Sequence, residues 1–203
     1  MKILFTGFEP FDGASVNASY EAVRRLPASI AGAAVETALL KAEFDGAVHA
    51  LKRLLSDRRP DAVICVGQAA GRGSVTPEKV AINYADAGIC DNAGFRPADR
   101  PLVPDGPAAY FSTLPVRAIA GRIAKEGIPA AVSYSAGTFV CNCVMYHLLK
   151  TAHEQYPEMK AGFIHVPLCL EQESGGGRPA LPIEKITRAL WLAAEETLSC
   201  RGT

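Results

Sequence analysis

The stretch Ala34–Val66, AVETALLKAEFDGAVHALKRLLSDRRPDAVICV, contains the pattern that decides the fold. Ala34–Leu40 is a short apolar segment typical of a strand, and Phe44–Ser56 gathers its apolar residues on one face of a helix. Asp61–Val66 is almost wholly apolar, which is typical of a central parallel strand covered on both faces. Strand, helix and strand in this order predict a layered α/β fold.

The same alternation continues on both sides of this stretch. Lys2–Thr6 and Ala161–Val166 are predicted as further buried strands, and Ala130–Ser133 as a short one. The polar, turn-rich segment Tyr84–Pro107 is expected to form a hairpin or excursion over the sheet, or a contact surface, and not a linker. Helices are predicted over Ser19–Leu26 with Ser19 as the cap, Leu114–Glu126, Cys141–His153 and Ile183–Leu198, with a polar loop over residues 171–180. We therefore expect one domain over residues 1–203, a three-layer α/β/α arrangement around a twisted, mostly parallel mixed sheet.

Composition narrows the classes of function. The 203 residues are 49% hydrophobic, enough for a sizeable core, and 21 basic residues balance 21 acidic ones. Without a basic stripe or an acidic tail, neither a nucleic-acid partner nor a disordered arm is indicated. We find no signal peptide and no apolar run long enough to span a membrane, so we expect a cytoplasmic protein with no membrane partner. Six cysteines at irregular spacing are then expected to be free thiols.

The segment Ser133–Leu149, SYSAGTFVCNCVMYHLL, places a cysteine at the start of an apolar helix. Free backbone N–H groups and the positive end of the helix dipole favour a thiolate at Cys141, which makes it a candidate nucleophile. The alternative is a buried structural cysteine, since free Cys is among the most buried residue types.

Four histidines limit the choice of a general base. His165 ends an apolar strand, where α/β enzymes place catalytic groups, and it is the best candidate; a hydrogen-bonded core histidine is the alternative. His147 lies on the same helix as Cys141 but faces elsewhere. Cys141, Cys143 and His147 also form a C-x-C-x3-H pattern, but no further ligand nearby completes a tetrahedral zinc set, so no metal is expected.

Two loops follow predicted strands. Phe8 and Phe11 flank a proline directly after the first strand, where ligands bind in open α/β sheets; alternatively, they only seal the sheet end. Gly67–Asn83, GQAAGRGSVTPEKVAIN, has glycines at a spacing that matches neither common phosphate-binding loop, and its Glu78 could be a surface carboxylate. A nucleotide- or phosphate-handling enzyme is an alternative that lacks a suitably placed lysine.

Several of these segments together resemble one family. Gly67–Asn83 is similar to the glutamate signature of the pyrrolidone-carboxylate peptidases (pyroglutamyl peptidase type I) at every fixed position. Ala136–Met145 resembles the cysteine signature of this cysteine peptidase family, Gly162–Pro167 its histidine segment, and Gly7–Gly13 its opening motif. The resemblance extends from end to end of the chain.

The resemblance implies a catalytic triad of Glu78, Cys141 and His165. Cys141 would attack the carbonyl that joins an N-terminal pyroglutamyl residue to the next residue, and His165, oriented by Glu78, would move the proton. The implied partners are peptides and proteins with N-terminal pyroglutamate, cleaved through a thioester without a cofactor. Dimers or tetramers are implied as well. The resemblance further implies that the lactam ring is held by Phe8, Phe11, Asn17, Gln68, Ile89, Phe139 and Val140.

The chain also departs from the family pattern. Gly88 stands where many members have Arg, and Cys90 where they have Pro, which puts any role of that Arg in polarising the carbonyl in doubt. Cys143 replaces a common His, and Cys169 adds a thiol near His165. The alternative function is therefore a catalytically impaired homologue that binds a small ligand on the same fold.

Overall fold

The computed structural model describes residues 1–173 and 177–199, so the predicted loop 171–180 lies partly outside the described residues. Its centre is a six-stranded sheet in the order β2-β3-β1-β4-β8-β5. β1 is parallel to β3 and β4, and β4 is parallel to β8, whereas the edge strands β2 and β5 are antiparallel. The predicted mostly parallel mixed sheet is confirmed. Its strands are β1 (Lys2–Phe8), β2 (Ser29–Ile30), β3 (Ala33–Leu40), β4 (Ala62–Gln68), β5 (Thr76–Pro77) and β8 (Lys160–Val166).

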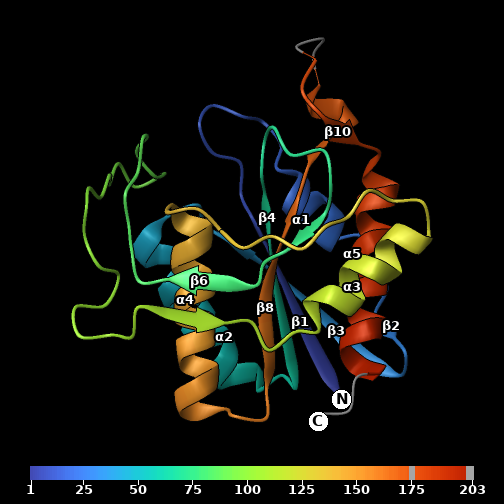
Figure 1. Cartoon of the computed structure of the whole chain (residues 1–203), viewed down its shortest axis with the longest axis horizontal. Coiled ribbons are helices and arrows are strands. Elements are labelled where there is room, and N and C mark those ends of the chain that lie inside the picture. Colours follow the sequence, from blue (N-terminus) through green and yellow to red (C-terminus); the bar gives the residue numbers. More distant parts are fainter. Residues whose placement is uncertain (174–176, 200–203) are drawn as a thin grey trace.

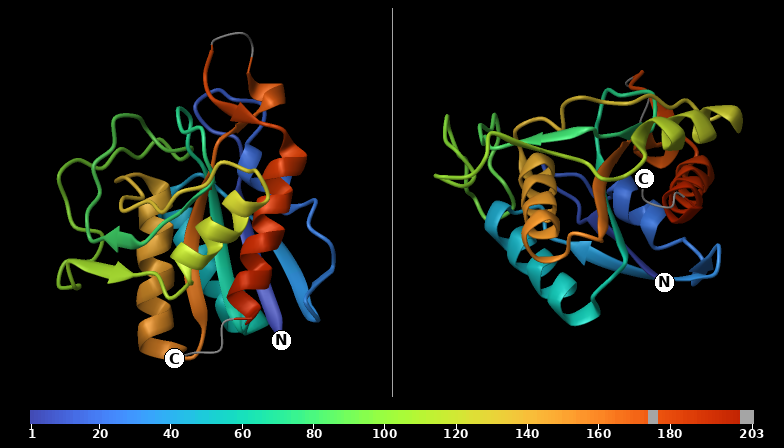
Figure 2. Two further views of the ribbon diagram at one scale, coloured as in Figure 1. Left: turned by 45° about the vertical axis from the view of Figure 1, so that its right-hand side comes forward. Right: turned by 60° about the horizontal axis from the view of Figure 1, so that its bottom comes forward.

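Helices cover both faces of this sheet, as the views in Figures 1 and 2 show. α2 packs beside α4 on one face, while α1, α3 and α5 cover the other. The layers are therefore α/β/α, as predicted. The helices are α1 (Ala18–Val23), α2 (Phe44–Arg58), α3 (Val116–Lys125), α4 (Val140–Gln155) and α5 (Ile183–Ser199), with a short 3-10 helix η1 (Leu170–Gln172).

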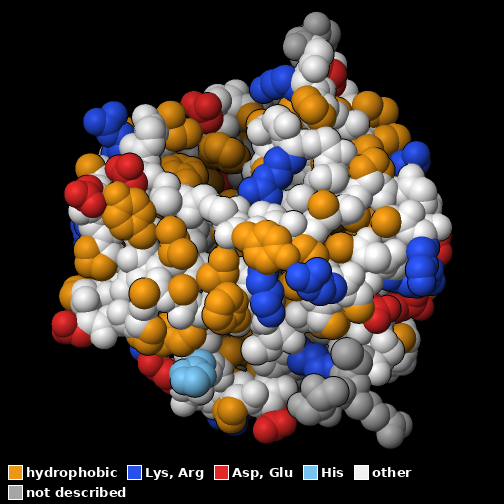
Figure 3. Space-filling model, in the orientation of Figure 1, with side chains coloured by type: hydrophobic (Ala, Val, Ile, Leu, Met, Phe, Trp, Pro, Cys, Tyr) orange, Lys and Arg blue, Asp and Glu red, His pale blue; other side chains and the backbone are white. Residues whose placement is uncertain are grey.

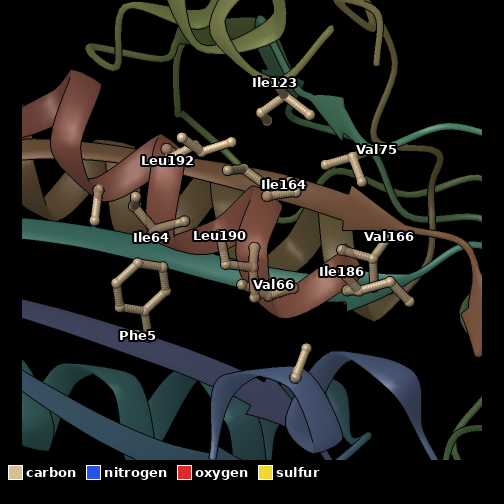
Figure 4. Packing of buried hydrophobic residues seen from close by; sticks show 14 of the residues in the cluster. Phe5, Ile64, Val66, Val75, Ile123, Ile164, Val166, Ile186, Leu190 and Leu192 are labelled. Atoms are coloured by element: carbon tan, nitrogen blue, oxygen red, sulfur yellow. The ribbon is translucent and has the colours of Figure 1, made fainter. Parts of the chain in front are cut away.

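Alternating strand residues supply the two halves of the core. In β4, Ile64 and Val66 pack on the α5 side, as Figure 4 shows, whereas Val63 and Cys65 pack on the α2–α4 side. These side chains are inaccessible to solvent. Helices on both faces explain why this strand is continuously apolar instead of alternating with polar residues.

The segment Tyr84–Pro107, predicted as an excursion, connects the two strands of a small antiparallel pair, β6 (Val80–Ile82) and β7 (Ala109–Phe111). Asp91 organises the intervening loop, because its carboxylate accepts hydrogen bonds from the N–H groups of Phe44, Ala93 and Phe95. In Figure 3 hydrophobic side chains are concentrated on the half of this face that lies over β6, β7 and this loop. A second small pair, β9 (Leu168–Cys169) and β10 (Ala180–Leu181), follows β8.

Two local predictions are wrong. Ala130–Ser133 is not a strand, because it meets Val75 and Glu78 only in isolated bridges; Pro77, which has no N–H, interrupts the facing segment. The first helix is capped by Asn17 and not by Ser19: the Asn17 side chain accepts a hydrogen bond from the Ser19 N–H at 3.0 Å. The other helices begin and end within two residues of their predicted bounds.

No helix in the described part of the chain is both long and apolar enough to cross a membrane.

Candidate active site

Cys141 lies in the first turn of α4, directly against the end of β4. A Cβ atom added to Gly67 would stand 2.8 Å from the Cys141 Sγ and 2.7 Å from the Phe163 ring. Only glycine leaves room there for the sulfur. The glycine thus brings the thiol to the carboxyl end of the sheet, where α/β folds bind ligands.

His165 reaches the same place from the neighbouring strand. In the parallel β4–β8 ladder, His165 is the partner of Gly67, the residue that touches the Cys141 sulfur. The His165 Nδ1 lies 2.7 Å from the Glu78 Oε1, and Glu78 has no solvent-accessible surface. Since Nδ1 is occupied by the carboxylate, Nε2 is the nitrogen left to exchange a proton with the thiol.

A cavity of about 150 Å³ opens onto these two side chains. Its walls are mostly aromatic and aliphatic, and none of the described residues that line it carries a full charge at neutral pH. The lining residues are Phe8, Phe11, Asn17, Ala42, Gln68, Ala136, Phe139, Val140, Cys141 and His165. The structure therefore brings together both reactive side chains and six of the seven residues predicted for substrate binding.

The aromatic walls are held by other rings. Phe139 lies 6.3 Å from Phe11 and 5.4 Å from Phe44 between ring centroids, and the Phe44 ring meets it edge-on. Edge-to-face contacts of this kind stabilise aromatic clusters beyond simple burial. The cavity is thus shaped before any ligand enters it.

Two amides supply the polar part of the wall. Asn17 is tied into the backbone, since its Nδ2 donates to the Glu9 carbonyl at 3.0 Å and its Oδ1 caps α1. Gln68 accepts a hydrogen bond from the Ala18 N–H at 2.8 Å through Oε1. The described hydrogen bonds include none from Gln68 Nε2, so its N–H₂ group can serve a ligand.

Ile89 is not brought to the cavity. Its loop is tied to the rim, because the Thr138 hydroxyl donates to the Asp86 carbonyl and the Asn92 side chain donates to the Pro10 carbonyl. The Ile89 side chain itself is 40% exposed and is not among the lining residues, because the loop turns outward between these two attachment points.

Burial sets the charge state of the resting site. Burial raises the pKa of the Cys141 thiol to about 12, with the negative charge of Glu78 acting in the same direction. Burial also lowers the pKa of His165, against the opposing effect of Glu78. Burial thus acts against the thiolate that the helix start was expected to favour, and it favours a neutral thiol and a neutral imidazole in the resting site.

Glu78 behaves differently. Burial acts to raise its pKa, but His165, Ser133 and Arg72 outweigh that effect and hold the pKa below its ordinary value. The carboxylate is thus ionised although it is buried, as a group that orients a histidine must be.

Two residues of this site were missed in the sequence. Arg72 donates to the Glu78 carboxylate from Nη1 at 2.6 Å. Asn142, buried directly after Cys141, accepts from the Ile82 N–H at 3.0 Å and donates to the carbonyls of Ile82 and Tyr84 at 2.9 and 3.0 Å. A polar residue inside an apolar helix was the available signal for Asn142; the short loop around Arg72 offered none.

The C-x-C-x3-H pattern does not gather in space. The Cys143 sulfur faces the Phe44 carbonyl at 4.0 Å, away from the cavity. Among the described residues, no group of three or more His, Cys, Asp or Glu side chains is placed to share a metal ion.

Comparison with known proteins identifies the family. A family model described as pyroglutamyl peptidase matches residues 1–199. The chain belongs to the pyroglutamyl peptidase family. The protein is accordingly an enzyme, a hydrolase of the cysteine peptidase type.

Individual relatives agree along almost the whole chain. The pyrrolidone-carboxylate peptidase of Levilactobacillus brevis is 46% identical over 194 residues, which is 95% of either chain. That of Thermococcus onnurineus is 48% identical over 189 residues, covering 93% of this chain and 94% of its own. The crystal structure of pyroglutamyl peptidase I from Bacillus amyloliquefaciens superposes with a TM-score of 0.96 at 43% identity, covering 98% of this chain and 95% of that one.

Proposed function

We propose that this protein hydrolyses the amide bond after an N-terminal pyroglutamyl residue, with Cys141 as nucleophile, His165 as general base and Glu78 as the group that orients His165. One observation carries the proposal: an uncharged, largely apolar cavity opens directly onto a thiol and an imidazole, and the Nδ1 of that imidazole is bonded to a buried carboxylate. The names of the related peptidases support the same activity.

The cavity suits a neutral five-membered lactam. We assign Phe11 and Phe139 as the apolar walls for the ring, and the N–H₂ group of Gln68 as the donor to its carbonyl. A free N-terminal glutamate would bring an ammonium and a carboxylate into walls that hold no opposite charge, at a large desolvation cost. We therefore expect cleavage of pyroglutamyl substrates and not of glutamyl ones.

The first chemical step combines attack and proton transfer. As the Cys141 sulfur bonds to the scissile carbonyl carbon, its proton passes to Nε2 of His165, and the imidazolium is stabilised by Glu78. The negative carbonyl oxygen is stabilised by backbone N–H groups in the first turn of α4. These groups are available because the first helical hydrogen bond of α4 is the one that the Cys143 N–H donates to the Phe139 carbonyl.

The intermediate then divides. The C–N bond breaks as His165 returns the proton to the leaving amine, and pyroglutamate is left as a thioester on Cys141. Water, deprotonated by His165, attacks that thioester, and the proton returns to the sulfur as pyroglutamate leaves. The complete cycle therefore starts and ends with a neutral thiol and a neutral imidazole, in accordance with the raised pKa of Cys141 and the lowered pKa of His165.

The test is release of a reporter amine from pyroglutamyl-amide. Cys141→Ala is expected to abolish release, while Cys143→Ala, two residues along the same helix and facing away from the cavity, serves as the matched control. Iodoacetamide inactivation is best measured in Cys90→Ala, because Cys90 is an exposed thiol that would also be alkylated. Full activity in Cys141→Ala, or comparable rates on glutamyl-amide, would contradict the proposal; binding of the lactam without release would favour the ligand-binding homologue.

Self-association stays a prediction. The exposed side chains of Ile82 and Phe111 on the β6–β7 pair are apolar surface that a dimer could bury. Sedimentation of Phe111→Glu beside the unchanged protein tests it, with a fall in molar mass as the expected result.

A further inference from the structure

Arg72 lies in the loop after β4, at the point where this loop passes over Glu78. Its Nη1 is 2.6 Å from the Glu78 Oε1, the same oxygen that lies 2.7 Å from the His165 Nδ1. Three further groups fix the guanidinium: Nη1 also donates to the hydroxyls of Thr76 at 2.7 Å and Ser133 at 3.4 Å, and Nη2 donates to the Ser135 carbonyl at 3.0 Å. The Arg72 side chain is 33% exposed, so it joins the buried carboxylate to the surface.

We propose that Arg72 is a positioning residue of this peptidase, which keeps the Glu78 carboxylate ionised and aimed at His165, so that the imidazole presents an unprotonated Nε2 to Cys141. The proposal rests on the proposed function, since it assigns Arg72 a part in the same proton transfer.

Charge compensation is the first reason. A carboxylate without solvent contact is strongly disfavoured unless a positive partner is nearby. His165 cannot supply that charge at rest, because its pKa is lowered and the ring is neutral. Among the ion pairs of the described residues, Arg72 therefore supplies the one permanent charge on Glu78.

The protonation pattern of His165 is the second reason. An ionised Glu78 accepts a hydrogen bond from Nδ1–H, which leaves Nε2 free to take the thiol proton. A protonated Glu78 could instead donate to Nδ1, and the ring proton would then sit on Nε2, facing Cys141. In that form the imidazole cannot act as the base. Protonation of Glu78 would therefore stop catalysis even if the positions of the non-hydrogen atoms stayed the same.

The shape of the guanidinium is the third reason. Its donors reach acceptors on two segments of the chain, Thr76 and Glu78 on one and Ser133 and Ser135 on the other. Ser135 precedes Ala136, which lines the cavity. A lysine would keep the charge but could not bond these acceptors as a planar fork does. Charge and loop anchoring can therefore be separated by substitution.

The experiment compares Arg72→Ala and Arg72→Lys with the unchanged protein, and Arg117→Ala is the control. Arg117 is an exposed arginine bonded to a neighbouring side chain, the Tyr134 hydroxyl, and it lies outside the cavity. Reporter-amide hydrolysis is measured across pH, and unfolding by denaturant confirms that each variant is folded.

Arg72→Ala is expected to lower kcat about 100-fold, the lower end of what a positioned base contributes, with KM changed less than about threefold. Removal of the cation raises the pKa values of both Glu78 and His165, so the acid limb of kcat/KM is expected to move about one pH unit upward. Arg72→Lys should keep the acid limb near its original position while kcat falls less. Arg117→Ala should change neither.

A second readout does not depend on turnover. In ¹⁵N-labelled protein, with the His165 signals assigned by comparison with His165→Gln, the unchanged protein should show an unprotonated Nε2 at neutral pH. Folded Arg72→Ala should show a protonated Nε2 in a substantial fraction of molecules. An unaltered tautomer together with an unmoved acid limb would overturn the proposal and leave Arg72 a loop anchor only. Absence of hydrolysis by the unchanged protein would overturn the proposed function instead, while the tautomer comparison would still decide the role of Arg72.

Discussion

Glu78 and Asp91 are both buried residues, 0% and 7% exposed, yet their carboxylates have different kinds of partner. Glu78 meets the side chains of His165 and Arg72, both of which can carry a positive charge. Asp91 meets backbone N–H groups, at Phe44, Ala93 and Phe95. Backbone amides hold a loop and a helix start in place, whereas an imidazole can exchange a proton with a substrate. Burial of a carboxylate therefore does not by itself make it a catalytic candidate; it is the titratable partner, His165, that makes Glu78 one.

The largest effect is expected from a substitution of Glu78. In Glu78→Gln, the amide oxygen can still accept from both Arg72 and the His165 Nδ1–H, but the negative charge that stabilises the imidazolium is lost. We expect kcat to fall about 10³- to 10⁴-fold, as when a triad carboxylate becomes an amide, with the fold retained. Steady-state kinetics and circular dichroism measure these two effects. A loss below tenfold would mean that His165 needs no carboxylate.

Acid pH should also separate the two carboxylates, because Glu78 has a titratable partner, His165, whereas Asp91 is bonded to backbone N–H groups. His165 must be neutral to act, and its pKa lies below the ordinary 6.5, so kcat/KM should hold at pH 6.5 and then fall about tenfold per unit on a limb at lower pH. The free energy of unfolding should change with pH in the same direction as kcat/KM. His165 and Glu78 both have folded pKa values below their ordinary 6.5 and 4.5, so the unfolded chain binds protons first and stability is lost as the pH falls below about 6.5.

Denaturant unfolding at a series of pH values, alongside the rate profile, measures this prediction. A stability that rises between pH 6.5 and 4.5 would contradict the assignment of a neutral, buried His165. Asp91→Asn should leave the acid limb of the rate profile where it is, since Asp91 has no titratable partner in the described hydrogen bonds.

Asp91→Asn tests the other half of the comparison. The Asp91 Oδ2 accepts from the Phe44 N–H at 2.9 Å at the start of α2, and an asparagine can supply only one of the two oxygens. The expected cost is about 1 kcal/mol of unfolding free energy, as for the loss of a helix cap. Since Phe44 supports Phe139, KM should rise while kcat stays within about threefold. A large fall in kcat with unchanged stability would make Asp91 a participant in the chemistry.

The smallest effect is expected from Gly88→Arg, in the loop that Asp91 holds. Gly88 is exposed, and a Cβ added to it meets nothing within 4 Å, so the substitution should change stability by less than about 0.5 kcal/mol. If a cation at this rim position helps to polarise the scissile carbonyl, kcat/KM should rise severalfold, and Gly88→Gln is the uncharged control. Equal values for the two variants would show that the loop contributes shape and no charge.

Sequence patterns predicted the parts of the molecule that follow from local order. Continuous apolar segments such as Asp61–Val66 indicated a doubly covered sheet, and the strand pattern indicated that His165 lies near the carboxyl end of a buried strand. The rest depends on contacts between distant segments. Arg72 reaches Ser135 and Glu78 only after folding, and the pKa of Cys141 depends on how completely its surroundings exclude water. The outward turn at Ile89 and the broken ladder at Ala130–Ser133 likewise depend on neighbours that a local pattern does not contain.

The contact between Gly67 and the Cys141 sulfur has a consequence for redesign of this enzyme. The sulfur occupies the space in which a side chain at position 67 would begin, so a residue on β4 and the proposed nucleophile compete for the same space. A larger residue at position 67 would have to push α4 away, whereas a smaller nucleophile, as in Cys141→Ser, would leave unfilled space beside β4. Directed evolution toward an oxygen nucleophile should therefore start from libraries that vary positions 67 and 141 together, because neither position can be optimised alone.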